Sequence, residues 1–212
     1  MSSPEFSPGL YRFCRDMLHA YLLLYHRMEV RGREHIPADG GCILAANHAS
    51  FVDPPVVGCA ARSRVVRFMA RDTLFRRGFS RWLLLNVAAV PLSREKGDVG
   101  ALKRALHVLK EGHCLGLFPE GTRSADGELQ APKGGIGFLI AKAGVPVVPM
   151  YVDGTFRAYP RDASIARPMK IRVFVGPAIR PEEFTAFGTG RESYARVGQL
   201  VMDRIASLRP TT

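Results

Sequence analysis

Short apolar runs alternate with amphipathic stretches along most of the chain. Runs typical of buried strands occupy residues 41–46, 65–70, 87–92, 114–118, 145–152 and 170–175. Helices are predicted from Pro54 onward and over residues 73–86, 98–111, 135–143 and 192–208. Strands that alternate with helices at these intervals predict an α/β fold, in which a mixed, largely parallel sheet is flanked by helices on both faces.

The N-terminal segment is predicted to form an amphipathic helix over residues 10–28. It mixes apolar residues such as Leu22 and Tyr25 with charged residues such as Arg12 and Asp16. No apolar run approaches the roughly 18–20 residues that a membrane-spanning helix needs. The helix is therefore suited either to a lipid headgroup boundary or to packing on the main domain.

Positive charge is concentrated in one segment of this chain, whose formal net charge is +11. Residues 61–81 contain one acidic residue, Asp72, and seven arginines: Arg62, Arg64, Arg67, Arg71, Arg76, Arg77 and Arg81. Such a cluster indicates an anionic partner, which can be a phosphate-bearing ligand, an anionic lipid surface or nucleic acid. A solvent-exposed face would give the same pattern. No recognisable DNA- or RNA-binding motif accompanies the charge, so we expect no nucleic-acid partner.

The four cysteines show neither a disulfide pattern nor a metal-binding pattern. Cys14, Cys42, Cys59 and Cys114 form no C-x-x-C pair, and none stands at metal-ligand spacing from a histidine. We therefore expect no metal site and a reducing interior, as in the cytoplasm.

A first polar segment, residues 47–53 (NHASFVD), interrupts the junction between a predicted strand and a predicted helix. Ligands bind at such junctions in open α/β sheets. On a continuous helix, side chains five residues apart do not meet, but a turn before Pro54 can fold the carboxylate of Asp53 back onto the imidazole of His48. A histidine oriented by a carboxylate is a general base near neutral pH. The alternative is that Asp53 only caps the helix and His48 is a turn residue.

A second polar segment, residues 118–124 (FPEGTRS), directly follows another apolar strand. Glu120, Arg123 and backbone N–H groups near Gly121 would form a compact surface for an anion and a hydroxyl group. Arg123 can bind a phosphate in a bidentate manner, which lysine cannot do. The alternative is a simple turn with a solvated Glu/Arg pair.

Together, the two segments resemble the signature motifs of the glycerolipid acyltransferases. Residues 47–53 are similar to the N-H-x4-D box of that family, and residues 118–124 match its second signature at every position. Residues 145–149 (VPVVP) match the V-P-x-x-P strand that follows, and Lys133 begins a K-x-G-like turn between them. The resemblance covers residues 32–177 and points to the lysophosphatidic acid acyltransferase-like (1-acyl-glycerol-3-phosphate O-acyltransferase) proteins.

Two further family segments are similar only in part. Arg71 stands where the family carries the lysine of an A-K-x-E-L segment, while Thr73 replaces its acidic residue. Residues 89–94 (AVPLSR) keep a degraded form of the G-x-I-F-I-x-R box.

The resemblance implies transfer of a fatty acyl group from a thioester to the free hydroxyl of a lysophospholipid. His48 would be the base, Asp53 would hold its tautomer, and the Gly121 N–H is one candidate for stabilising the oxyanion. Arg123, helped by Arg71, would bind the acceptor phosphate. Glu120 would orient glycerol oxygens, and Asn47, Thr122 and Lys133 are the remaining expected substrate-binding residues.

The family also implies partners and a location. No cofactor is expected beyond acyl-CoA or acyl carrier protein as co-substrate, and 1-acyl-glycerol-3-phosphate is the expected acceptor. Residues 1–30 would form a membrane-associating segment and residues 31–212 the acyltransferase catalytic domain. The arginines of residues 61–81, interleaved with Phe68, Phe75, Phe79 and Trp82, would bind an anionic membrane surface. We thus expect a cytoplasmic enzyme attached peripherally to the inner face of the cell membrane.

Other functions are compatible with the same residues. The acceptor could instead be a lyso-ornithine lipid, glycerol-3-phosphate or a glycan hydroxyl. The same His-Asp pair could act on water, which would make the protein an acyl-thioester hydrolase.

Overall fold

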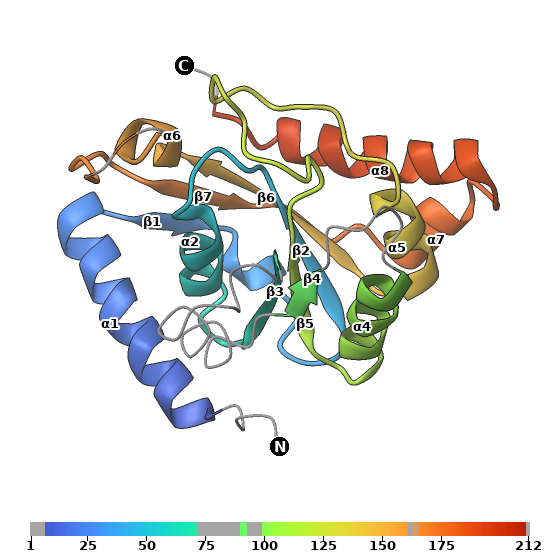
Figure 1. Cartoon of the computed structure of the whole chain (residues 1–212), viewed down its shortest axis with the longest axis horizontal. Helices are drawn as coiled ribbons and strands as arrows, with labels where there is room; N and C mark the ends of the chain where they lie inside the picture. The colour runs from blue at the N-terminus through green and yellow to red at the C-terminus, as the bar shows by residue number, and fades with distance from the viewer. Residues whose placement is uncertain (1–6, 72–89, 93–98, 161–162, 164, 211–212) are drawn as a thin grey trace.

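The fold is a mixed sheet between two layers of helices, seen in a computed structural model that describes residues 7–71, 90–92, 99–160, 163 and 165–210 (Figure 1). The predicted helix over residues 73–86 lies outside the described residues, as do residues 87–89 of a predicted strand.

In the described part of the chain, seven strands form one sheet in the order β1-β7-β6-β2-β5-β3-β4. The strands are β1 (Glu29–Arg31), β2 (Cys42–Ala46), β3 (Val66–Arg71), β4 (Val90–Leu92), β5 (Cys114–Leu117), β6 (Val147–Asp153) and β7 (Arg172–Val175). The five strands from β6 to β4 are mutually parallel, whereas β7 runs antiparallel to β6 and pairs in parallel with β1. The predicted mixed, largely parallel sheet is confirmed.

Helices cover both faces of this sheet (Figure 1). They are α1 (Pro8–His26), α2 (Asp53–Ala60), α4 (Val99–Lys110), α5 (Ile136–Ala143), α6 (Thr155–Ala158), α7 (Pro181–Thr185) and α8 (Arg191–Ala206), with a 3-10 turn η1 (Arg33–His35). The sequence did not predict β1, η1, α6 or α7, because three to five residues are too few to show a hydrophobic period.

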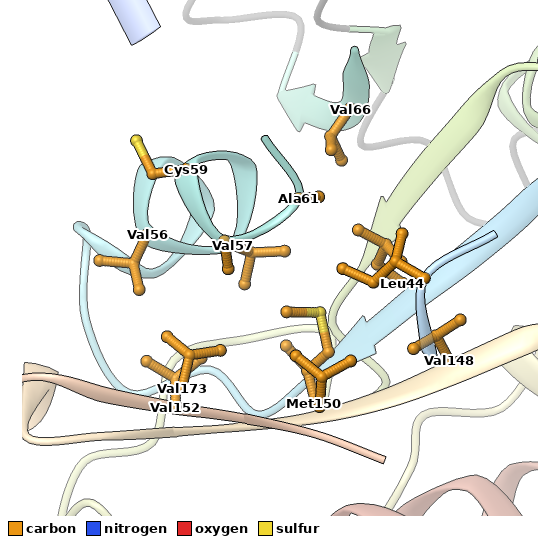
Figure 2. Packing of buried hydrophobic residues seen from close by; sticks show 14 of the residues in the cluster. Leu44, Val56, Val57, Cys59, Ala61, Val66, Val148, Met150, Val152 and Val173 are labelled. Carbon is orange, nitrogen blue, oxygen red and sulfur yellow. The ribbon is translucent and has the colours of Figure 1, made fainter. Parts of the chain in front are cut away.

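Strand β2 divides the core into two clusters, because successive side chains of a strand point to opposite faces. Leu44 and Ala46 pack in the cluster under α1 and α2, whereas Ile43 and Ala45 pack in the cluster under α4, α5 and α8. All five residues of β2 are buried, which explains why its sequence is uniformly apolar. Figure 2 shows Val56 and Val57 of α2 facing the first cluster near Met150.

Helix α1 is fixed to the main domain at its C-terminal end. The backbone N–H of Ile171 donates to the carbonyl of His26 at 3.1 Å, and the His26 ring Nδ1 lies 3.0 Å from the carbonyl of Met169. The Tyr25 hydroxyl donates to the carbonyl of Ala166 at 3.0 Å. The described part of the predicted segment 1–30 is therefore joined by hydrogen bonds to the chain that leads into β7.

The opposite side of α1 exposes large apolar residues. Phe13 is 64% exposed, Met17 60% and Leu24 84%, and the spacing of four and seven residues places the three on one side of the helix. Within the described residues, no helix combines the length and apolar character that crossing a membrane requires. Packing of this helix on the main domain is confirmed. Its other side presents an unburied apolar stripe, and contact of this stripe with lipid stays a prediction.

The crossing of α5 and α8 depends on Gly137. A Cβ atom at this position would overlap the backbone carbonyl of Tyr194 in α8. We predict that Gly137→Ala lowers the free energy of unfolding by about 1–3 kcal/mol, because the helices must move apart. Urea denaturation would measure this.

The matched control is Gly134→Ala, because a Cβ atom at Gly134 meets no atom within 4 Å. Equal stability losses in the two variants would contradict the predicted close packing of α5 on α8.

Candidate active site

His48 and Asp53 form a hydrogen-bonded pair where β2 leads into α2. His48 Nδ1 lies 2.9 Å from Asp53 Oδ2, and the side chains are 18% and 0% exposed. The pair leaves Nε2 of the ring as the nitrogen that can accept a proton from a substrate. The predicted fold-back of the carboxylate onto the imidazole is confirmed.

The Asp53 carboxylate is held by the turn that precedes it. Its Oδ2 also accepts the backbone N–H groups of Ala49 at 2.7 Å and Ser50 at 2.6 Å. Asp53 is the first residue of α2, and no side-chain capping bond is made to that helix. The alternative reading, in which Asp53 serves as a helix cap, is therefore wrong.

The flat side of the His48 ring is supported by Phe118, at the start of the second polar segment. The two ring centroids lie 4.1 Å apart with an interplanar angle of 19°, and Phe68 stacks next at 6.0 Å from Phe118. A Cβ atom at Gly116 would overlap the Phe68 ring, so this glycine leaves room for the stack. Sequence reasoning missed Phe118 as a site residue, although it stands in the FPEGTRS motif itself.

Glu120 is enclosed next to the backbone of His48. It is 2% exposed, and its Oε1 accepts the backbone N–H of His48 at 2.9 Å. Burial raises the pKa of Glu120 and the nearby Asp53 adds a smaller rise, while the backbone N–H groups of His48 and Gln130 lower it, and the resulting pKa is about 7. The predicted contact with glycerol oxygens is not supported by this enclosed position.

Two predicted substrate-binding residues make internal hydrogen bonds. Asn47 is buried, its Nδ2 donates to the carbonyl of Val152 at 3.0 Å, and its Oδ1 accepts the Val152 N–H at 2.7 Å. It thereby joins the ends of β2 and β6. The Gly121 N–H donates to the carbonyl of Phe118 at 2.9 Å, so the prediction that it stabilises an oxyanion is wrong.

Arg123, Thr122 and Lys133 lie at the rim of the site. The Arg123 guanidinium stacks 3.4 Å above the ring centroid of Phe51, which belongs to the first polar segment and is 58% exposed. Thr122 and Lys133 are exposed, and the aliphatic part of Lys133 lies against Gly121. Their substrate-binding roles stay predictions, as does that of Arg71, of which the structure describes only the backbone at the end of β3.

The arginines of residues 61–81 do not form one patch as far as they are described. Arg64 is buried and donates to three backbone carbonyls, those of Pro37, Gly40 and Gly112. Arg67 contacts His113, and Arg62 pairs with Asp16 of α1 at 3.8 Å. The prediction that Arg64 binds an anionic partner is wrong, because its guanidinium binds two loops, residues 36–41 and the loop at Gly112.

The remaining members of that segment stay untested. Arg76, Arg77, Arg81, Phe75, Phe79 and Trp82 lie outside the described residues. Phe68, expected at a membrane surface, instead packs beside Phe118 against the buried core.

A family model described as Acyltransferase matches residues 27–153, more than half of the chain. The chain belongs to the acyltransferase family. The matched segment contains both polar segments, and therefore His48, Asp53, Glu120 and Arg123.

Two similar acyltransferases differ in how much of their own length this chain spans. The chain is 27% identical over 200 residues to the 1-acyl-sn-glycerol-3-phosphate acyltransferase of Bacillus subtilis, covering 94% of this chain and 96% of the relative. It is 33% identical to a chloroplastic 1-acyl-sn-glycerol-3-phosphate acyltransferase of Brassica napus over 64% of this chain, but spans only 40% of that longer relative.

A solved structure shows the same architecture. The crystal structure of the 1-acyl-sn-glycerophosphate acyltransferase of Thermotoga maritima superposes with a TM-score of 0.75 at 27% identity, over 95% of this chain and 83% of that chain. The family and fold predicted from the motifs are confirmed.

The raised pKa of Glu120 predicts a pH dependence of stability for this acyltransferase. The folded protein holds a proton on Glu120 up to about pH 7, whereas the unfolded chain releases it near pH 4.5. The contribution of Glu120 to the free energy of unfolding is therefore complete below pH 4.5. It declines by about 3 kcal/mol in total as the pH rises to 7.

Urea denaturation of wild type and Glu120→Gln between pH 4.5 and 8 would measure this decline as the difference between the two proteins. The variant should gain stability relative to wild type as the pH rises. A constant difference would contradict the raised pKa.

Proposed function

We propose that this acyltransferase transfers a fatty acyl group from a thioester to the free hydroxyl of 1-acyl-glycerol-3-phosphate, giving phosphatidic acid. The observation that carries the proposal is the His48–Asp53 pair at 2.9 Å, and Arg123 stacks on Phe51 of the same polar segment. The printed names of the relatives from Bacillus subtilis and Brassica napus support the same acceptor.

His48 acts as the general base. Its Nε2 takes the proton of the acceptor hydroxyl while the hydroxyl oxygen attacks the thioester carbonyl carbon. Asp53 keeps the proton on Nδ1 and stabilises the imidazolium that forms. The carbon–sulfur bond then breaks, and the imidazolium returns its proton to the departing thiolate. A thiolate leaves readily because the pKa of a thiol is only about 8.5, so no protein nucleophile is needed.

Arg123 is suited to the acceptor phosphate. Stacking on Phe51 keeps the guanidinium plane in place, and a fixed planar guanidinium binds phosphate oxygens in a bidentate manner. Lys133 lies on the same rim, against Gly121, and adds a second positive charge. Acyl-CoA or acyl carrier protein would present the acyl group.

Ser50, which stands between His48 and Asp53 in the sequence, and three of the four cysteines have structural positions. The Ser50 hydroxyl donates to the carbonyl of Tyr159 at 2.7 Å, and Ser50 is fully buried. Cys42, Cys59 and Cys114 are buried in the core. These contacts favour direct transfer to the acceptor over an acyl-enzyme intermediate.

We predict that His48→Ala lowers the rate of acyl transfer by about a hundredfold to ten-thousandfold, the usual contribution of a general base. The assay would offer one radiolabelled acyl-CoA with a panel of acceptors that includes 1-acyl-glycerol-3-phosphate, glycerol-3-phosphate and a lyso-ornithine lipid. Product is expected with the lysophospholipid.

His107→Ala is the control, because His107 is exposed on α4. Thioester loss that does not depend on any acceptor would identify a hydrolase and would sink the transfer proposal.

We infer peripheral attachment to a membrane, and the exposed stripe of α1 supports it. Phe13, Met17 and Leu24 can enter the interface, while Arg12 on the same helix and Arg27 just after it are exposed and favour anionic headgroups. A lipid-consuming enzyme gains access to its acceptor in this way, and we place it at the inner face of the cell membrane.

We predict that the double variant Phe13→Asp/Leu24→Asp binds anionic phosphatidylglycerol vesicles at least about tenfold more weakly than wild type, because each buried apolar side chain contributes about 1.5–3 kcal/mol. Vesicle sedimentation at low and high salt would measure binding. Ile165→Asp is the matched control, since Ile165 is 79% exposed outside α1. Equal loss in that variant, or equal wild-type binding to neutral vesicles, would contradict attachment through α1.

A further inference from the structure

The two polar segments are joined at the backbone of His48 itself. The His48 N–H donates to Glu120 Oε1 at 2.9 Å, and the His48 carbonyl accepts the N–H of Ser124 at 2.7 Å. Residues 118–124 therefore bind both backbone polar groups of His48, its N–H and its carbonyl.

Glu120 has no surface to offer a substrate. The residue is 2% exposed, its Oε1 is already bonded to His48, its Oε2 is buried as well, and the backbone N–H of Gln130 faces the same carboxyl group. A lipid hydroxyl would reach this carboxyl group only if the surrounding chain moved away.

The ring and the backbone of His48 are fixed by different groups. Asp53 and Phe118 set the direction and plane of the imidazole, but neither bonds the His48 backbone. A base works only when its nitrogen lies within hydrogen-bond reach of the reacting hydroxyl, so the position of the His48 Cα matters as much as the ring orientation.

We propose that Glu120 is a positioning residue for the base: its Oε1 holds the His48 N–H and thereby sets the place of His48 relative to the phosphate-binding rim at Arg123. The inference rests on the proposed acyl transfer, and it replaces the substrate contact that the family motif implied for Glu120. The neutral and ionised forms of a carboxyl group both accept a hydrogen bond, so the role needs an acceptor oxygen at this reach and not a charge.

Two substitutions at Glu120 distinguish the effect of side-chain length from the effect of charge. Glu120→Gln keeps the side-chain length and an acceptor oxygen but removes the charge, whereas Glu120→Asp keeps the charge but is one methylene shorter. We expect Glu120→Gln to retain kcat within about threefold, and Glu120→Asp to lose about tenfold to hundredfold in kcat, the worth of one buried hydrogen bond. The acceptor KM should stay within about threefold in both variants, because the hydrogen bond acts on the base alone.

The matched controls are Glu128→Gln and Glu128→Asp, because Glu128 is exposed in the loop that follows the second polar segment and pairs with Arg209. Both should behave as wild type. A rise of more than about tenfold in the acceptor KM of Glu120→Gln would instead identify a substrate contact. Loss of kcat in Glu120→Gln with activity kept in Glu120→Asp would show that charge matters, and either result overturns the proposal.

A measurement without any acceptor keeps this test independent of the proposed function. Diethyl pyrocarbonate modifies neutral imidazole rings, and mass spectrometry of the His48 peptide reports the rate at this one ring. Glu120→Gln should match wild type within about twofold, whereas Glu120→Asp should react at least about threefold faster, because a lost hydrogen bond of this kind is worth a tenfold or larger change in the population of the held state. Identical rates in all three proteins would overturn the positioning role even if no acyl transfer were ever observed.

Discussion

One buried oxygen, Asp53 Oδ2, accepts three hydrogen bonds: from the ring of His48 and from the backbone N–H groups of Ala49 and Ser50. A carboxylate without these donors would be costly to bury. The same bonds shape the turn between β2 and α2, so the turn and the base are fixed by one group. Because that turn lies at the carboxyl end of the central strand, the whole sheet supports the position of the base.

The second polar segment extends this support outward from the turn. Phe118 backs the imidazole ring, Glu120 and Ser124 hold the backbone of His48, and Arg123 stacks on Phe51 of the first segment. Each motif therefore completes the other, which explains why two segments some 70 residues apart in the sequence act as one site. Arg123 and the proposed base His48 are consequently held by the same two segments.

The sequence predicted the parts of this molecule that local chemistry determines. Uniformly apolar runs predicted the central strands, and the proline after Asp53 predicted the turn that brings it to His48. It could not predict contacts made by distant segments: Asn47 bonds the backbone of β6, and Arg64 ties two loops together. A count of charges cannot tell a buried arginine from an exposed one, and a motif cannot tell that Glu120 is enclosed.

The anchored end of α1 has a mechanical consequence. A helix on a flexible linker could change its orientation relative to the rest of the enzyme. Helix α1 cannot do so freely, because His26 and Tyr25 are hydrogen-bonded to the chain leading into β7. The exposed stripe is thus rigidly oriented with respect to the sheet. If a membrane receives Phe13 and Leu24, as proposed, it also fixes the tilt of the sheet and the distance of His48 and Asp53 from the lipid.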